Sequence, residues 1–396
     1  MVLHTVVLAG GDSATSFSFY LPTKVVFGFG SLDALSAEAR ALSANRPLIV
    51  TDRVMVKTGI VEKVTAKLGD ARFEVFDGVE AEPRLEVAEA VADRVRRDIF
   101  DAVIGVGGGS AMDMAKVAAA FATNPGPPKQ YVGNNLFGRR PLPSIMVPTT
   151  AGTGAELTVT SMVTVAGHKQ WINSPLLLPS VAVVDPELTI TMPRSVTAAT
   201  GLDALSHNTE AYLSDEANVI TDAAALEGIK LVSGNLVKAY TDGNDRKARE
   251  AMSLGALLGG IALHARMVYG HSIGYTIATR FNLPHGVSCG IPLPYIIARY
   301  AEAVAPKMQR LAEAYGVDAG SREPKMLGEA IAQKVKEILA ELGVPSSLKG
   351  LGVKEADLPN LADECLKTYG RTNSPVVFDA EKMNHLYNQM WQGIFE

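Results

Sequence analysis

The sequence predicts an α/β fold in two parts, a parallel sheet covered by helices in residues 1–193 and an all-helical part in residues 194–396. Up to Asp185, short apolar runs bounded by turn residues alternate with helical runs, which is typical of a parallel sheet with helices on both faces. After Met192-Pro193, every long periodic run has the period of a helix. We therefore expect a domain boundary near residue 193.

The predicted elements of the first part follow one another along the chain. Residues 1–18 are rich in glycine and serine, and we expect a poorly ordered extension there. Strands are predicted over 24–27, 47–52, 73–76, 102–106, 144–148, 158–165 and 180–185. Helices are predicted over 59–68, 86–98 and 111–121.

The second part contains predicted helices only. Pro306 should divide one of the runs in two, because proline interrupts the hydrogen bonds of a helix interior. The predicted helical runs are 198–213, 221–240, 248–265, 295–314 and 326–342.

Composition excludes several classes of protein. The chain has 396 residues, of which 47% are hydrophobic and 20% charged, and its net charge is -5, so there is no basic excess to hold a nucleic acid. The two cysteines argue for a reducing compartment. The longest apolar runs fall short of the roughly 20 residues of a membrane span, and no basic residues precede the apolar patch near the N-terminus as in a signal peptide. We expect a cytoplasmic protein that binds neither membrane nor nucleic acid.

Three consecutive glycines directly after a predicted strand point to phosphate binding. Gly107-Gly-Gly-Ser110 follows strand 102–106 and opens helix 111–121. Glycines let a backbone approach a pyrophosphate, and the N–H groups of a helix start point at it. Alternatively, Ser110 and Asp113 form a capping box, although a cap does not need three glycines. The earlier Gly28-Phe-Gly30 turn fails as a dinucleotide fingerprint, because Asp33 stands where its third glycine belongs.

One carboxylate and three imidazoles form a candidate metal site. Asp203 and His207 lie four residues apart in a predicted helix, so both side chains are on one face. His271 and His285 follow, and Pro284 suggests that His285 lies on a loop. One oxygen and three nitrogens suit Fe²⁺ or Zn²⁺ with a position open for substrate. Alternatively, Asp203 and His207 form only a hydrogen bond on a helix surface.

These motifs together resemble the iron-containing (group III) alcohol dehydrogenases over residues 20–396. The resemblance rests on five stretches in the same order and spacing: Gly107-Gly-Gly-Ser110 with Asp113 and Lys116, Pro148–Glu156, Gly201–His207, His271, and Asn282–Gly286. It implies a dinucleotide-binding domain, a helical domain, and NAD(P) with a divalent metal between them. Iron is the metal that it favours, with zinc as the alternative.

The resemblance also implies roles for individual residues. The implied metal ligands are Asp203, His207, His271 and His285. The residues implied to bind the pyrophosphate are Gly107, Gly108, Gly109 and Ser110. Those implied to line the rest of the cofactor site are Asp113, Thr149, Thr150 and Thr153. Asp52 is implied to lie near the adenosine ribose.

Asp52 predicts NAD rather than NADP. It ends strand 47–52, where an acid accepts from ribose hydroxyls and repels a 2′-phosphate. Alternatively, Asp52 caps a helix. Arg53 lies beside it and can pair with a 2′-phosphate, so NADP is the alternative cofactor. The small and hydroxyl residues from Thr149 to Gly154 can line a cofactor or form a plain surface loop.

Two features depart from the family pattern. Tyr275 stands where family members commonly have a histidine that is thought to assist proton transfer. Tyr275 either replaces that histidine in proton transfer or only packs against neighbouring side chains. His264 and Arg266 add polarity where small apolar residues are usual. If Arg266 lies on a helix, its phase turns it away from His271, which favours an ion pair over an anchor for a substrate carboxylate.

We therefore expect a metal-dependent NAD(H) alcohol dehydrogenase or aldehyde reductase that forms a homo-oligomer, a dimer or larger. A hydroxyacid dehydrogenase of the 4-hydroxybutyrate type or a hydroxyacid–oxoacid transhydrogenase is the first alternative, and it needs a carboxylate anchor. A metal-dependent lyase like dehydroquinate synthase needs a basic pocket, and the second half has no such Lys/Arg cluster. A non-catalytic nucleotide-binding scaffold has no use for an open metal position.

Overall fold

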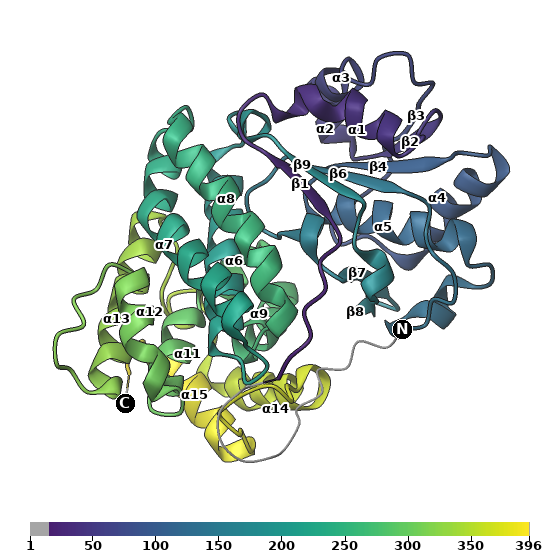
Figure 1. Ribbon diagram of the computed structural model, residues 1–396. Coiled ribbons are helices and arrows are strands. Elements are labelled where there is room, and N and C mark those ends of the chain that lie inside the picture. Colours follow the sequence, from purple (N-terminus) through teal and green to yellow (C-terminus); the bar gives the residue numbers. More distant parts are fainter. Residues whose placement is uncertain (1–15, 396) are drawn as a thin grey trace. The chain divides into compact units, whose positions relative to one another are not determined.

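The structure, a computed structural model, describes residues 16–395, which divide into two compact units (Figure 1). The first unit comprises residues 16–150 and Gly154–Ile190, and the second comprises Ala151–Thr153 and residues 191–395. Most of the extension predicted over residues 1–18 lies outside the described residues. The domain boundary predicted near residue 193 remains a prediction.

A six-stranded parallel sheet forms the centre of the first unit. Its strand order is β1-β9-β6-β4-β2-β3, and every neighbouring pair is parallel. The strands β2, β4, β6 and β9 are buried along their whole length, as their continuous apolar sequences predict. The strands are β1 Lys24–Phe27, β2 Pro47–Val50, β3 Glu74–Phe76, β4 Ala102–Gly107, β6 Ser144–Pro148 and β9 Val181–Val184.

Helices cover both faces of this sheet, which confirms the predicted fold class (Figure 1). Leu48 and Val50 of β2 join one apolar core with residues of α4 and α5, whereas Ile49 between them joins the other core with α1 and α3. This alternation follows from the period of two in a strand. The helices are α1 Leu35–Ala41, α2 Arg53–Lys57, α3 Ile60–Thr65, α4 Leu85–Arg97 and α5 Gly109–Thr123.

A second, small sheet was not predicted, and it corrects the placement of one strand. β7 Thr160–Val165 does not join the parallel sheet but pairs antiparallel with β8 His168–Asn173, and β8 pairs with β5 Gly133–Asn134. Ala166 and Gly167 connect β7 to β8 with φ angles of 50° and 81°. Two residues with positive φ form the tight turn that suits a hairpin, so this dipeptide was the available sequence signal.

The described residues of the second unit form helices and no strand, as predicted. One continuous apolar core runs through them. The predictions missed α9, α10, α14 and α15, while the break around Pro306 is confirmed by a 3₁₀ turn at Ala305–Lys307. The helices are α6 Arg194–Leu213, α7 Val219–Thr241, α8 Arg246–Ala262, α9 Tyr269–Phe281, α10 His285–Gly290, α11 Leu293–Tyr300, α12 Met308–Ala314, α13 Pro324–Glu341, α14 Leu358–Tyr369 and α15 Ala380–Gln392.

Helix α6 lies at the centre of this unit, and it is buried on every side from Gly201 to Leu213. Helix α10 approaches it closely at Gly286, where an added Cβ would overlap the carbonyl oxygen of Ala199. Glycine is therefore required at this position for steric reasons. The close approach brings the first turn of α10 against the turn of α6 that carries Asp203, which is 2.8 Å from the same added Cβ.

Two predicted local conformations were wrong. His285 is not on a loop but is the first residue of α10, because Pro284 takes the N-cap position, where its missing N–H costs nothing. The helix predicted over 248–265 ends at Ala262 and continues as a 3₁₀ turn, after which Arg266 has a φ of 62°. The helical phase assumed for Arg266 relative to His271 therefore does not apply.

Within the part of the chain that the structure describes, no single helix has the length and apolar character to cross a membrane. One strongly bent pair, Arg246–Ala265 with Tyr269–Ala278, meets that test of length and composition only when its members are taken together.

Candidate functional site

The carboxylate of Asp203 lies at the centre of three imidazoles. The Nε2 atoms of His207, His271 and His285 each lie 3.7 Å from the same atom, Oδ1 of Asp203. These separations are too long for hydrogen bonds. Two ligand atoms about 2.1 Å from a shared cation lie roughly 3–4 Å apart, so the spacing is that of a metal centre. The structure thus brings together all four residues predicted as ligands.

Three helices of the second unit position these side chains. Asp203 and His207 lie one turn apart on α6, with side chains 4% and 7% exposed. His271 is in the first turn of α9 and fully buried, and its ring stacks on that of His207 at 4.7 Å between centroids. His285 begins α10 and is 30% exposed, which makes it the most accessible of the four.

Three buried polar atoms of these four residues have no hydrogen-bond partner, namely Oδ1 of Asp203, Nδ1 of His207 and Nε2 of His271. A buried polar atom without a partner costs free energy that a folded protein normally avoids. Burial alone would raise the pKa of the Asp203 carboxyl, but the three surrounding imidazoles hold that pKa below its ordinary value. An ionised carboxylate and unpaired imidazole nitrogens are the forms that bind a divalent cation, so these residues fit a metal.

Glu210 contacts His271 of the centre, and the sequence predictions missed it. Its Oε1 lies 2.6 Å from Nδ1 of His271, and its Oε2 accepts the backbone N–H of His271 at 3.1 Å. The hydrogen bond assigns the proton to Nδ1 and leaves the lone pair of Nε2 directed at the centre. Asp203, His207 and Glu210 recur on one face of α6, which was the available sequence signal.

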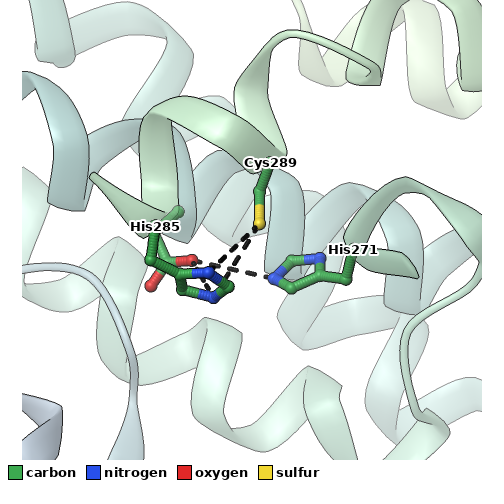
Figure 2. A group of neighbouring side chains, drawn as sticks. His271, His285 and Cys289 are labelled. Carbon is green, nitrogen blue, oxygen red and sulfur yellow. Dashed lines mark hydrogen bonds and ion pairs between the residues drawn. The ribbon is translucent and has the colours of Figure 1, made fainter. Parts of the chain in front are cut away.

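Cys289 also lies at the centre, and the sequence predictions missed this residue too. Figure 2 shows its sulfur beside His285 and facing His271. The Sγ atom is 3.8 Å from both ring nitrogens of His285. Ligand atoms of Asp203, His271, His285 and Cys289 all lie within 4.8 Å of one another, a set that does not include His207. The spacing of His285 and Cys289, one turn of α10, was visible in the sequence.

Tyr275 lies next to two of the imidazoles. Its ring is parallel to that of His285, with 5.6 Å between centroids and 9° between planes. It also meets the ring of His271 edge-on at 6.3 Å and that of Tyr369 at 5.2 Å. The structure therefore places Tyr275 in the wall of the centre, one turn after His271 on α9.

In the first unit, the glycine loop leads directly into α5. Gly108 is the N-cap residue and no side chain caps the helix, so the N–H groups of its first turn are not taken up by a capping residue. Gly107 has a φ of 146°, and a Cβ there would lie 2.8 Å from the Cβ of Ala111. Glycine is therefore needed at position 107. Thr150 lines the loop, 3.5 Å from an added Cβ at Gly108.

The capping box considered for this helix is absent. Asp113 does not reach the start of α5, because its Oδ2 accepts the backbone N–H of Met162 at 2.9 Å and its Oδ1 lies 3.1 Å from Nζ of Lys116. Lys116 is fully buried and donates to the carbonyl oxygens of Ala155 and Thr160 at 3.0 and 2.7 Å. This pair ties α5 to the segment after β6.

Asp52 caps a helix, which was one of the two roles weighed for it, and its role towards the ribose remains a prediction. Its Oδ1 accepts the backbone N–H groups of Val54 and Met55 at 2.8 and 3.0 Å, which caps α2. Its Oδ2 faces the glycine loop, 3.5 Å from an added Cβ at Gly107. One oxygen of the carboxylate therefore holds the helix, while the other is directed to the loop predicted to bind pyrophosphate.

The threonines after β6 have different surroundings. Thr149 is buried, and its hydroxyl lies 3.2 Å from the sulfur of Met55. Thr150 lines the glycine loop, whereas Thr153 belongs with Ala151 and Gly152 to the second unit.

The Gly28–Asp33 turn has a structural explanation. The N–H groups of Gly30 and Leu32 donate to the carboxylate of Asp185 at 3.2 and 3.1 Å, which joins the end of β1 to the end of β9. The glycines there adopt positive φ angles of 124° and 82°. This turn therefore holds two adjacent strand ends together.

A parallel sheet with a glycine loop at the carboxyl end of a central strand, and a buried oxygen–nitrogen donor set on helices, together define a metal-dependent enzyme that uses a dinucleotide. Comparison with known proteins gives the family. Residues 22–186 match the family model "Iron-containing alcohol dehydrogenase", and residues 197–391 match "Fe-containing alcohol dehydrogenase family, C-terminal".

Individual relatives agree with these matches. The long-chain-alcohol dehydrogenase 1 of Geobacillus thermodenitrificans is 36% identical, over 86% of this chain and 88% of its own. The 1,3-propanediol dehydrogenase of Citrobacter freundii is 34% identical, over 94% and 98%. Among solved structures, a 1,3-propanediol oxidoreductase superposes with a TM-score of 0.90 at 33% identity, over 95% of this chain and 100% of its own. A sulfoacetaldehyde reductase from Bifidobacterium kashiwanohense, solved with NAD⁺, gives 0.87 at 28% identity, over 95% and 99%.

The chain therefore belongs to the iron-containing alcohol dehydrogenases. The predictions of an NAD-dependent oxidoreductase acting on an alcohol or aldehyde, and of a divalent metal, are confirmed at the level of the family.

Proposed function

We propose that the chain interconverts a small alcohol and its aldehyde with NAD(H), using a divalent metal held by Asp203, His207, His271 and His285. The observation that carries this proposal is the convergence of three imidazole nitrogens, each 3.7 Å from one carboxylate oxygen. When bound, the metal supplies Lewis-acid polarisation of the substrate oxygen. Of its four ligands, His285 is the most exposed, so we place the approach of the substrate on its side.

The residues around the ligands have supporting roles in this proposal. Glu210 keeps His271 in the tautomer that directs Nε2 at the metal. Tyr275, parallel to His285, takes part in moving the hydroxyl proton of the substrate towards solvent. Its position one turn after His271 supports this role.

We infer that the first unit acts as the dinucleotide-binding domain. The N–H groups at Gly107, Gly108, Gly109 and Ser110 bind the pyrophosphate, since α5 begins there without a side-chain cap. Asp52 faces this loop and accepts from the adenosine ribose. Thr149, Thr150 and Thr153 line the remainder of the cofactor site. The carboxylate of Asp113 is paired with Lys116, so we assign it to holding α5 in place rather than to direct contact with NAD.

The substrate is a plain alcohol in this proposal rather than a hydroxyacid. A hydroxyacid requires a cationic anchor, and the candidate Arg266 forms an ion pair with Glu216 at 2.7 Å, with both side chains partly exposed. A cytoplasmic location is supported by two free cysteines, Cys289 and Cys365, which are both buried. A homo-oligomer remains part of the proposal, to be checked by light scattering after size-exclusion chromatography.

The proposal is tested by following NADH absorbance with NAD⁺, a panel of short alcohols, and protein loaded with Fe²⁺ or Zn²⁺. We expect turnover that chelation removes and added metal restores. His285→Ala should lose metal and nearly all turnover yet still bind NAD⁺, because the glycine loop lies in the other unit. His385→Ala, an exposed histidine on α15, is the matched control and should behave like the unmodified protein. Full activity in a sample verified as metal-free by elemental analysis would refute the proposal.

A further inference from the structure

We propose that the rings of Tyr275 and Tyr369 form an aromatic face beside the metal centre, and that this face selects alcohols whose carbinol carbon carries a flat aromatic group. The inference rests on the proposed function and names the substrate class of the same site. It makes Tyr369 a specificity-determining residue, a role that neither the metal ligands nor the residues of the dinucleotide site explain.

The first support is a continuous row of three rings that begins at the metal centre. The ring of the ligand His285 is parallel to that of Tyr275, with 5.6 Å between centroids and 9° between planes. The ring of Tyr275 in turn meets that of Tyr369 at 5.2 Å and 52°. Both separations lie in the range of roughly 4.5–7 Å in which aromatic rings attract one another. The row therefore continues the wall of the centre with two phenol rings.

The second support is that this row lies on the accessible side of the centre. From Tyr269 to Ala278, every residue of α9 is buried except Tyr275, which is half-buried. His285 is the most exposed of the four ligands at 30%, and Tyr369 is half-buried. The proposed function places the approach of the substrate at His285. A substrate with its oxygen at the centre would therefore extend its carbon chain along these rings.

The third support is that the backbone of Tyr369 is held in place. The buried hydroxyl of Ser272, on α9, donates to the carbonyl oxygen of Tyr369 at 2.6 Å and accepts from Nε of Arg371 at 2.8 Å. Tyr369 is the last residue of α14, which packs against α9. A side chain carried by a fixed backbone loses little freedom when a ligand binds, so its contact contributes more to affinity.

The chemistry of the aromatic face favours a flat ring over a saturated one. Aromatic pairs attract through the quadrupoles of their π-systems, which contributes about 2- to 10-fold in affinity beyond the burial of apolar surface. A saturated ring of the same size buries a similar area but has no such quadrupole. Alternatively, Tyr369 only closes the contact between α9 and α14, and then the choice between the two kinds of ring would not depend on it.

The test compares benzyl alcohol with cyclohexylmethanol, which share a carbon skeleton and differ in whether the ring is aromatic. We measure the ratio of their kcat/KM values with NAD⁺ and metal-loaded protein. Tyr369→Leu should lower this ratio about 2- to 10-fold, whereas Tyr369→Phe should keep it, because phenylalanine retains the ring. The difference in intrinsic reactivity between the two alcohols cancels when the ratios of variants are compared. Tyr240→Leu, on α7, is the matched control.

The possible outcomes separate the inference from the proposed function. An unchanged ratio in Tyr369→Leu would overturn the inference, and so would an equal fall in Tyr369→Phe, since the hydroxyl and not the ring would then be responsible. Metal content is measured in every variant, because damage to the centre would lower it and the turnover of both alcohols together. Absence of turnover with every alcohol in the unmodified protein would instead refute the proposed function, and the inference with it.

Inhibition of the unmodified protein provides a test that needs no variant to fold. Benzamide and cyclohexanecarboxamide each present a carbonyl oxygen, as the aldehyde does, and neither is turned over. Burial of apolar area alone predicts that the saturated compound binds at least as tightly. We expect benzamide to compete with the alcohol at about 2- to 10-fold lower concentration. An inhibition constant for benzamide equal to or above that for cyclohexanecarboxamide would refute the aromatic face.

Discussion

Nδ1 of His271 lies 2.6 Å from Oε1 of Glu210, and both side chains are fully buried. The same carboxylate accepts the backbone N–H of His271 through Oε2, so it holds both the ring and the start of α9. Gly270 permits this approach, because a Cβ at that position would lie 2.5 Å from Oε1 of Glu210. Glu210 is thus the residue that orients His271.

Glu210→Gln should weaken metal binding about 10- to 100-fold while leaving the fold intact. The amide oxygen of glutamine can still accept from Nδ1, but its NH₂ group then faces the backbone N–H of His271, and the two donors repel. The dissociation constant for Zn²⁺, measured by competition with a chelator, checks this. Glu216→Gln removes a partly exposed carboxylate of the same unit and is the control. Unchanged zinc affinity in Glu210→Gln would contradict the positioning role.

Tyr275→Phe should lower kcat by about 100-fold if the hydroxyl moves the substrate proton, since general acid–base groups contribute rate factors of that order. Phenylalanine keeps the ring that lies parallel to His285, so metal content should not change. The measurements are kcat, its pH profile and metal content. Tyr240→Phe, on α7, is the control. If kcat and the pH profile stay as they were, Tyr275 only packs.

Asp52→Asn should narrow the preference for NAD over NADP. Asparagine caps a helix as well as aspartate does, so α2 is retained while the charge facing the glycine loop is lost. Two unit charges a few ångströms apart near a surface interact by about 1–4 kcal/mol, so we expect the ratio of kcat/KM values to fall about tenfold or more. Asp70→Asn removes an exposed charge and is the control. Equal efficiency with both cofactors in the unmodified protein would refute this role of Asp52.

The buried Glu156 should make stability depend on pH. Burial raises its pKa from 4.5 to about 7, with Lys116 opposing that shift. Between these two values the folded protein binds more protons than the unfolded chain, so the free energy of unfolding falls as pH rises from about 4.5 to about 7 and then levels off. The full shift corresponds to at most about 3 kcal/mol.

Glu156→Gln should remove this part of the pH dependence. We compare the free energy of unfolding of the variant with that of the unmodified protein at two pH values, using denaturant midpoints. The difference should favour the variant more at about pH 8 than at about pH 5. Glu80→Gln changes an exposed carboxylate and should show no such difference. A variant whose midpoints follow those of the unmodified protein at both pH values would contradict the assignment.

Arg266 allows a paired test of strain and substrate binding. Its φ of 62° and ψ of 155° fall in a region used almost only by glycine, at a cost of about 1–3 kcal/mol. Arg266→Ala and Arg266→Gly both remove the ion pair with Glu216, but only glycine relieves the backbone. We expect the glycine variant to unfold at higher denaturant than the alanine variant, by about 1 kcal/mol after the larger entropy of the unfolded chain is included.

The same two variants decide the role of the guanidinium. Because Arg266 is paired with Glu216, turnover of hydroxyacids relative to plain alcohols should be unchanged in both variants. A selective loss of hydroxyacid turnover would instead establish Arg266 as a carboxylate anchor.

Local pattern in the sequence predicted the parallel sheet and the helical second unit. The buried strands could be recognised because a strand covered on both faces must be apolar throughout, as Leu48-Ile49-Val50 is. The glycine loop was recognisable because it combines a strand, three glycines and a helix within one short stretch. Asp203 and His207 were paired correctly on one face, since their spacing within α6 is a property of any helix.

Contacts between separate elements could not be read in this way. Asp113 and Ser110 had the spacing of a capping box, yet the carboxylate pairs with Lys116 and with the backbone of β7. Likewise, β7 had the sequence of a strand, but its partner was decided by the turn at Ala166-Gly167. A residue's spacing determines its neighbours within an element and not which other element it meets.

The sequence by itself determined the family, the two kinds of structure and four residues able to bind a metal. Tertiary structure decided that Glu210 orients His271 and that Cys289 lies beside His285. Both depend on how closely α9 and α10 approach their neighbours, which glycines 270, 274 and 286 permit. The physical reason is that a helix fixes the direction of its side chains, whereas the partner they reach is set by packing between helices far apart in the chain.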